Sequence, residues 1–174
     1  MSNIVEYDRN FKFDEIKKEN ISDLKFYRTG DAIYAVWLDK SDNGIKLSIS
    51  IDSGKKFSLP QTVMNTNGHI RDLQILAKDD QFVVALIETI SNQDSKRACS
   101  GWLNTQGKNY SYKPCTSHQI NGELINMFLS FNEKESIDHM ITRTDDGIIH
   151  EITMGHGCAV KDLKSIPITT VKLS

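Results

Sequence analysis

The stretch that decides the fold is SISIDSGKKFSLP, residues 48–60, in which an alternating run of small and apolar side chains breaks at Asp52. An Asp side chain accepts hydrogen bonds from nearby backbone N–H groups and Gly readily adopts positive φ, so Asp52 and Gly54 predict a tight turn. Phe57 comes three residues after the Gly, where it can fold back over that turn. The stretch therefore predicts a β-strand followed by a turn that its own side chains brace.

Strand patterns of the same kind occur along most of the chain. Short runs rich in Val, Ile, Tyr, Phe and Trp are separated by clusters of Asp, Asn, Ser and Gly, which is typical of strands joined by turns. The runs are DAIYAVWLD (31–39), GIKLSISI (44–51), QFVVALIETI (81–90), INMFLSF (125–131) and GIIHEITM (147–154), and the turn clusters are SDNG (41–44), KDD (78–80) and TDDG (144–147). No run after residue 20 keeps the apolar period of a helix, so the sequence predicts an all-β protein.

The chain also contains an internal repeat. ISDLKFYRTGDAIYAVWLD, from Ile21, is echoed by IRDLQILAKDDQFVVALIE, from Ile70, and more faintly by LINMFLSFNEKESIDHMITR, from Leu124. Repeats with a period of about 20 to 50 residues mark arrays in which each unit is one supersecondary structure. We therefore predict a single domain, 1–174, with three four-stranded units at 21–66, 67–120 and 121–174 and a partial unit, an N-terminal hairpin, at 1–20.

Ser50, Asp52, Gly54 and Phe57 form the pattern Ser-x-Asp-x-Gly-x-x-Phe, which resembles the Asp-box, or BNR repeat, of the sialidase-like β-propellers. Degraded copies begin at Asp8, Thr105 and Gly155, and with Asp52 as the matching position of the full copy the successive spacings are 44, 53 and 50 residues. These spacings are close to the length of a four-stranded propeller blade. The resemblance implies a propeller-like array of about three four-stranded antiparallel blades plus the N-terminal hairpin, with the four matching residues in a structural role.

The same resemblance points first to sialidases and other glycoside hydrolases. Such sialidases use three clustered arginines, a tyrosine paired with a glutamate, and an aspartate as acid/base. The arginines of this chain are scattered, at positions 9, 28, 71, 97 and 143, and an early Arg-Ile-Pro motif is missing. The sequence departs from the catalytic pattern, so we predict no catalytic residue and no cofactor. The alternative is a divergent glycoside hydrolase whose site is completed by oligomerisation.

Charge and composition narrow the other classes of function. The chain has 174 residues, with 21 Lys and Arg against 23 Asp and Glu, so no overall positive field attracts nucleic acid or anionic lipid. No run approaches the ~20 apolar residues of a membrane span, and the N-terminus lacks the pattern of a secretory signal. We expect a cytoplasmic protein that binds neither nucleic acid nor membrane, although a mature secreted form would look the same. A Cys99–Cys115 disulfide stays open for the secreted case.

One cluster has metal-ligating side chains, in HEITMGHGC, where His150, His156 and Cys158 lie close in sequence. In a strand, His150 and Glu151 point to opposite faces, so these two side chains do not converge. Zinc sites require three or four converging ligands, and the helical His-Glu-x-x-His signature is missing. The three residues are weak candidates, and the sequence predicts no metal. The Cys158–His156 and Cys115–His118 pairs lack a third orienting group and do not predict a nucleophile.

Aromatic residues give the remaining candidates for a binding site. Trp37 lies in an apolar run, so we predict that it packs in the core. Trp102 lies in the more polar CSGWLN and is followed by Tyr110 and Tyr112. Exposed together, these three rings would stack on a sugar or anchor a protein. The sequence therefore favours a non-catalytic interaction module that binds a protein or a glycan.

The number of predicted blades indicates whether the chain needs a partner to cover its sheet edges. Closed propellers typically have 4 to 8 blades, and three blades with a stray hairpin leave sheet edges that require pairing or cover. We therefore expect a homodimer or a protein partner that covers these edges. The aromatic side chains of the N-terminal segment, at Tyr7, Phe11 and Phe13, are the expected contact.

Overall fold

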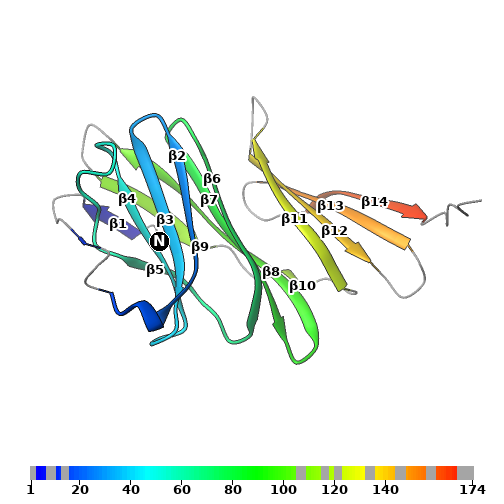
Figure 1. The fold of residues 1–174 in the computed structure, drawn as a ribbon. Coiled ribbons are helices and arrows are strands. Elements are labelled where there is room, and N and C mark those ends of the chain that lie inside the picture. Colours follow the sequence, from blue (N-terminus) through cyan, green and yellow to red (C-terminus); the bar gives the residue numbers. More distant parts are fainter. Residues whose placement is uncertain are drawn as a thin grey trace, which may run out of the picture.

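The strands form three antiparallel sheets that follow one another along the chain, as a computed structural model of the protein shows (Figure 1). The backbone is described for residues 3–6, 11–12, 16–104, 109–114, 118–119, 123–131, 136–143, 148–155 and 160–167. Side chains are described for 11–12, 16–104, 109–113 and 129–130. The all-β class is confirmed, since the helical part of the described chain is the short 3₁₀ turn η2 (Lys18–Asn20).

The first sheet has four strands in the order β2-β3-β4-β5. Its strands are β2 (Ile21–Thr29), β3 (Ala32–Asp39), β4 (Gly44–Ser50) and β5 (Gln61–Asn65). The predicted turn at 41–44 lies between β3 and β4, where Asn43 adopts a φ of 53°. Asn tolerates this left-handed conformation better than most residues, which accounts for its place in so tight a connection.

The second sheet has the order β1-β9-β8-β7-β6, with β10 pairing to β8 beside that path. Its strands are β1 (Asn3–Glu6), β6 (His69–Lys78), β7 (Gln81–Ile90), β8 (Gln93–Asn104), β9 (Asn109–Pro114) and β10 (His118–Gln119). Every residue from Phe82 to Glu88 on β7 is buried, so both faces of this strand are covered.

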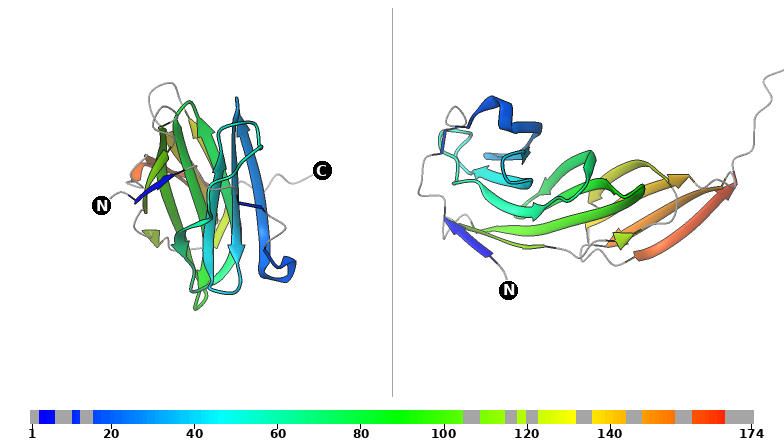
Figure 2. Two further views of the ribbon diagram at one scale, coloured as in Figure 1. Left: turned by 90° about the vertical axis from the view of Figure 1, so that its left-hand side faces the viewer. Right: turned by 90° about the horizontal axis from the view of Figure 1, so that it is seen from below.

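The third sheet again has four strands, in the order β11-β12-β13-β14. They are β11 (Glu123–Phe131), β12 (Ser136–Arg143), β13 (Ile148–Gly155) and β14 (Val160–Pro167). The first strands of the three sheets are neighbours, because β6 contacts β2 of the first sheet and β11 of the third. The sheets therefore form an array in chain order, with the second in the middle (Figure 2).

The N-terminal segment differs from the predicted hairpin. Strand β1 pairs with β9, with Val5 opposite Tyr110, and so extends the second sheet. Phe11, expected as a contact with another molecule, is buried against Trp37 in this chain, with parallel rings 6.3 Å apart. Tyr7 and Phe13 lie outside the described residues. The segment therefore reaches two sheets, because the free edge of β9 and the apolar surface around Trp37 both provide partners for it.

The main core lies between the first and second sheets. One face of β3 and β4 meets one face of β6, β7 and β8, and burial of apolar side chains on both sides holds the two sheets together. The first sheet contributes Tyr34, Val36, Ile45, Leu47 and Ile49, and the second contributes Leu73, Ile75, Phe82, Val84 and Leu86. The prediction that Trp37 is buried is confirmed, but it packs on the opposite face of the first sheet, with Ala35 and Phe11.

Candidate functional site

The turn after β4 is organised around the hydroxyl of Ser50. This hydroxyl donates to Asp52 Oδ1 at 2.8 Å and accepts from the backbone N–H of Gly54 at 2.9 Å. Asp52 Oδ1 also accepts from the backbone N–H of Lys56 at 2.9 Å. Gly54 has a φ of 87°, a conformation that a side chain would strain. The serine and aspartate side chains thus satisfy backbone donors that the tight turn leaves without strand partners.

The same turn is tied to its neighbours on both sides. Ser53 donates from its backbone N–H to Asp31 O at 2.9 Å and from its hydroxyl to Asp31 Oδ1 at 2.7 Å, which joins it to the β2–β3 turn. Phe57 lies against the cluster of Phe11, Ala35 and Trp37, and its carbonyl accepts from Phe11 N–H at 3.1 Å. The turn therefore connects β4 to a small aromatic cluster on the outer face of the first sheet.

Asp52 is engaged within this turn. Desolvation raises the pKa of its carboxyl, but the hydrogen bonds from the Lys56 N–H and the Ser50 hydroxyl outweigh that effect, so the pKa lies below its ordinary value. A carboxyl with a lowered pKa stabilises the fold above its unfolded-state pKa, and this contribution is lost as the pH falls through the folded-state pKa. The arrangement suits a carboxylate that braces a turn, because its oxygens already accept from the turn.

Replacing Asp52 with alanine is expected to lower the free energy of unfolding by about 1–3 kcal/mol, because the Lys56 N–H and Ser50 hydroxyl lose their acceptor. Urea unfolding followed by circular dichroism measures the loss. Asp52→Asn is the matched control: it keeps an oxygen at the same position and is expected to cost less. An Asn variant as unstable as the Ala variant would show that the negative charge, and not the acceptor, braces the turn.

The predicted aromatic binding surface is not formed. Tyr110 and Tyr112 are buried between the first and second sheets, where Tyr110 packs edge-on against Phe82. Desolvation raises the pKa of the Tyr110 hydroxyl above its ordinary value, and a hydrogen bond with Ser58 only partly opposes it. Trp102 is opposite Ser111 in the ladder, while Leu103 is opposite Tyr110, so the tryptophan projects from the other face of the sheet. The three rings cannot form one platform for a sugar.

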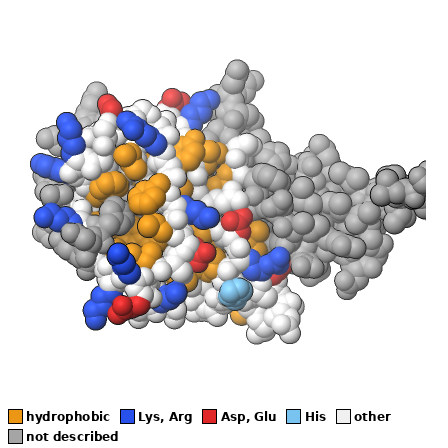
Figure 3. All heavy atoms as spheres, viewed as in Figure 1, with side chains coloured by type: hydrophobic (Ala, Val, Ile, Leu, Met, Phe, Trp, Pro, Cys, Tyr) orange, Lys and Arg blue, Asp and Glu red, His pale blue; other side chains and the backbone are white. Residues whose placement is uncertain are grey.

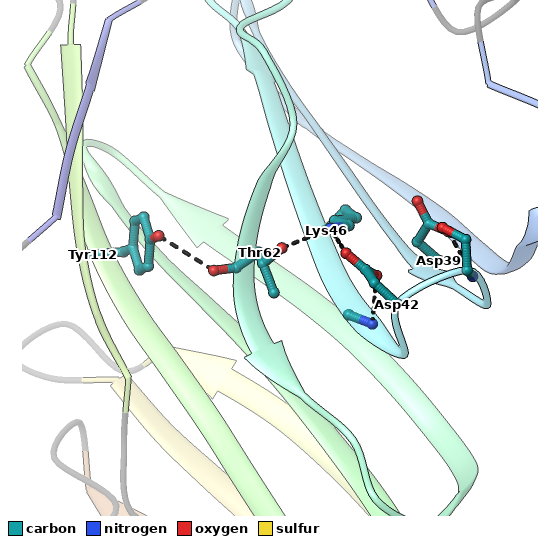
Figure 4. A network of polar contacts seen from close by, with 7 residues as sticks. Asp39, Asp42, Lys46, Thr62 and Tyr112 are labelled. Carbon is teal, nitrogen blue, oxygen red and sulfur yellow. Dashed lines mark hydrogen bonds and ion pairs between the residues drawn. The ribbon is translucent and has the colours of Figure 1, made fainter.

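A polar network joins the second sheet to the edge of the first (Figure 4). The Tyr112 hydroxyl donates to Thr62 O at 3.3 Å, and Lys46 Nζ donates to Thr62 Oγ1 at 2.6 Å. Lys46 also pairs with Asp42, which accepts from the Gly44 N–H at 2.9 Å. The hydrogen bond from Lys46 is the main cause that lowers the pKa of Asp42. Tyr112, a predicted binding residue, is therefore one of the contacts between β9 and β5.

Two buried carboxylates, Glu88 and Asp94, each have a hydrogen-bond network of their own that the sequence did not predict. Glu88 accepts from Arg97 at 3.2 Å and from the Thr66 hydroxyl at 2.7 Å. Asp94 accepts from Arg71 at 2.5 Å and from the Thr89 hydroxyl at 2.6 Å. Both carboxylates lie near the β7–β8 turn, and each is held by two donors, so buried charges here are paired as folding requires. A charged residue inside the apolar run QFVVALIETI was the available signal.

No metal site is found among the described residues, where no three His, Cys, Asp or Glu side chains converge. His150 is placed only by its backbone, in β13, and His156 and Cys158 lie outside the described residues. Cys99 is buried, while Cys115 also lies outside that part. The degraded repeats at 8–10 and 105–108 fall outside it too. Within the described part, no helix has the length and apolar character needed to cross a membrane.

The largest exposed apolar side chains of the first sheet lie on β2. Phe26 is 57% exposed and Leu24 is 39% exposed. Phe26 is opposite Ala35 in the ladder, so it lies on the face that carries Trp37, away from the main core. We call this face, with Leu24, Phe26, Ala35 and Trp37, the outer face of the first sheet. Figure 3 shows apolar side chains gathered over this part of the molecule with Lys and Arg around them.

No protein-family model matches this chain, and no curated protein sequence matches it at a significant level. The features that bear on function are therefore the arrangement of the three sheets, the contacts of the Asp52 turn and the exposed outer face.

Proposed function

We propose that the protein is a non-catalytic, propeller-like interaction module of the Asp-box type, and that it binds a protein partner through the outer face of the first sheet. The observation that carries this proposal is the exposure of Phe26 and Leu24 side by side on an open sheet face. Exposed apolar patches bordered by polar residues mark protein interaction sites, because their burial is favourable.

The arrangement of strands supports the propeller-like part of the proposal. Three antiparallel sheets follow one another along the chain, and their first strands, β2, β6 and β11, are neighbours. The Asp52 turn lies between the third and fourth strands of the first sheet. Recurrence of a four-stranded antiparallel unit along the chain is typical of blade repeats.

The burial of side chains favours a protein over a glycan as the partner. Tyr110 and Tyr112 lie in the core, whereas glycan binding through stacking requires exposed rings. Among the described side chains, the carboxylates Glu88 and Asp94 are buried and held by arginine and threonine. A glycoside hydrolase places two carboxyl groups on either side of an accessible sugar, which these two groups do not offer.

A photo-crosslinking amino acid at position 26 tests the proposal in extracts. It is expected to form crosslinks to protein, because the partner covers Phe26. The same group at Lys78, which is exposed at the end of β6, is the control and is expected to form few. A glycan array and a panel of aryl glycosides complete the test. Specific glycan binding, or turnover of a glycoside, together with no crosslink at position 26 would contradict the proposal.

A further inference from the structure

The internal repeat relates the exposed residues of β2 to buried residues of β6. Alignment of the Asp-Leu pairs at 23/24 and 72/73 matches Leu24 with Leu73 and Phe26 with Ile75. The backbone supports this match, since both strands have a register shift close to the Asp-Leu pair, between Ser22 and Lys25 in β2 and between Ile70 and Asp72 in β6. Leu73 is 1% and Ile75 is 9% exposed, against 39% for Leu24 and 57% for Phe26. Equivalent positions are thus buried in one sheet and exposed in the other.

The cover over Leu73 and Ile75 is a sheet. Both side chains lie in the main core, opposite the first sheet's Tyr34, Val36 and Leu47. In the second sheet, the face that carries the leucine of the Asp-Leu pair therefore packs against the preceding sheet. By the repeat, the face of the first sheet that carries Leu24 is suited to the same kind of packing. On the outer face of the first sheet, Phe11 and Ile16 pack near Trp37 and Ala35, while Phe26 and Leu24 stay largely exposed. Leu73 and Ile75 of the second sheet are covered by the inner face of the first sheet. A sheet face of the same kind would complete the cover over Leu24 and Phe26.

We propose that this cover is the third sheet of a second copy of the chain, so that two chains join head to tail; this inference rests on the proposed interaction function. The first and third sheets lie at opposite ends of the array (Figure 2). The first sheet of one chain can therefore pack against the third sheet of another. Two chains of three sheets give six, within the range of about 4 to 8 blades found in closed propellers. A two-fold ring forms the same contact twice and leaves neither end open.

The distribution of charge agrees with this partner. Residues 121–174 contain eight Asp and Glu against five Lys and Arg. On the outer face of the first sheet, the exposed Arg28 lies two positions after Phe26, and the exposed Lys56 lies next to Phe57 of the aromatic cluster. Opposite charges across an interface steer association and set its orientation. Contact between two copies of the outer face would instead bring Arg28 and Lys56 near their own copies, so the head-to-tail contact is favoured over a symmetric face-to-face one.

Light scattering and sedimentation of the purified chain at micromolar concentration test the association. The expected particle is a dimer of 19.7 kDa chains. Phe26→Asp and Leu24→Asp are expected to raise the dissociation constant by about tenfold or more, because a charge replaces an apolar contact at the interface. Ile90→Asp is the matched control: Ile90 is 38% exposed, as Leu24 is, but lies at the end of β7 in the second sheet. Circular dichroism verifies that each variant is folded.

Crosslinking of mixed ¹⁴N- and ¹⁵N-labelled chains tests the orientation. Crosslinks between chains are expected to join Lys56, next to Phe57 of the outer-face cluster, to lysines of 121–174, such as Lys161 and Lys164. A monomer at high concentration, dimers unaffected by Phe26→Asp, or interchain crosslinks that join Lys56 to Lys56 would each overturn the inference. A monomeric chain that still forms protein crosslinks through position 26 in extracts would overturn the second copy as partner and leave the proposed function standing. A monomeric chain that also forms no protein crosslinks through position 26 would overturn both the inference and the proposed function.

Discussion

Replacement of Trp37 with alanine is expected to lower the free energy of unfolding by about 3–5 kcal/mol, a large part of the stability of an ordinary domain. Trp37 is completely buried, and its ring stacks on Phe11 at an angle of 6°. Removal of the indole leaves a cavity between β3 and the N-terminal segment, and Phe11 loses the surface on which it lies. Urea unfolding followed by far-ultraviolet circular dichroism gives the loss without relying on the fluorescence of the deleted ring.

Trp102→Ala provides the matched control, because Trp102 is the other tryptophan of the chain and is only half-buried. It is expected to cost clearly less, since less surface and a smaller cavity are involved. Fluorescence of the remaining Trp102 in the Trp37 variant would show whether the second sheet keeps its structure. A loss for Trp102→Ala equal to that for Trp37→Ala would contradict the different burial of the two rings.

The parts of the fold that the sequence predicted correctly depend on local patterns. Alternation of apolar residues and turn clusters of Asp, Asn and Gly act over a few residues, so the all-β class and the four-stranded antiparallel sheets could be predicted. The N-terminal segment was predicted wrongly as a hairpin because its partner is distant. β1 pairs with β9, more than 100 positions away, and no local signal identifies which free edge a short strand will join.

The aromatic site was predicted wrongly for a related reason. The polar letters of CSGWLN suggested an exposed strand, but Cys99, Ser100 and Gly101 are small residues buried beneath larger neighbours. The face on which each ring lies depends on the register of β8 with β9, and a shift of one residue reverses it. The Glu88–Arg97 pair and the exposed outer face also depend on tertiary contacts. The comparison of Leu24 and Phe26 with Leu73 and Ile75 shows that the outer face is exposed at positions that are buried in the second sheet.

Gly101 shows how small residues set the positions of the aromatic rings, and Gly101→Ala is expected to destabilise the protein by about 3 kcal/mol or more. A Cβ atom at this position would lie 2.2 Å from Phe82 Cζ and 2.4 Å from the backbone oxygen of Ser111. Phe82 is completely buried and packs against Tyr34 and Tyr110, so its ring has little room to move. Thermal and urea unfolding measure the loss.

Two further variants separate the causes of that loss. Gly30→Ala is the control for backbone conformation: Gly30 has a φ of 58°, but its Cβ would meet no atom within 4 Å, so a cost of only about 1–2 kcal/mol is expected. In a protein that already carries Phe82→Leu, Gly101→Ala is expected to cost less stability than it does in the wild-type protein. The smaller side chain at position 82 removes one of the two clashes. The contact with the Ser111 oxygen remains, so the recovery is incomplete. Equal losses of stability for Gly101→Ala and Gly30→Ala would contradict the packing argument. Of the two sites, a Cβ atom clashes with neighbours only at Gly101, so the loss should be larger there.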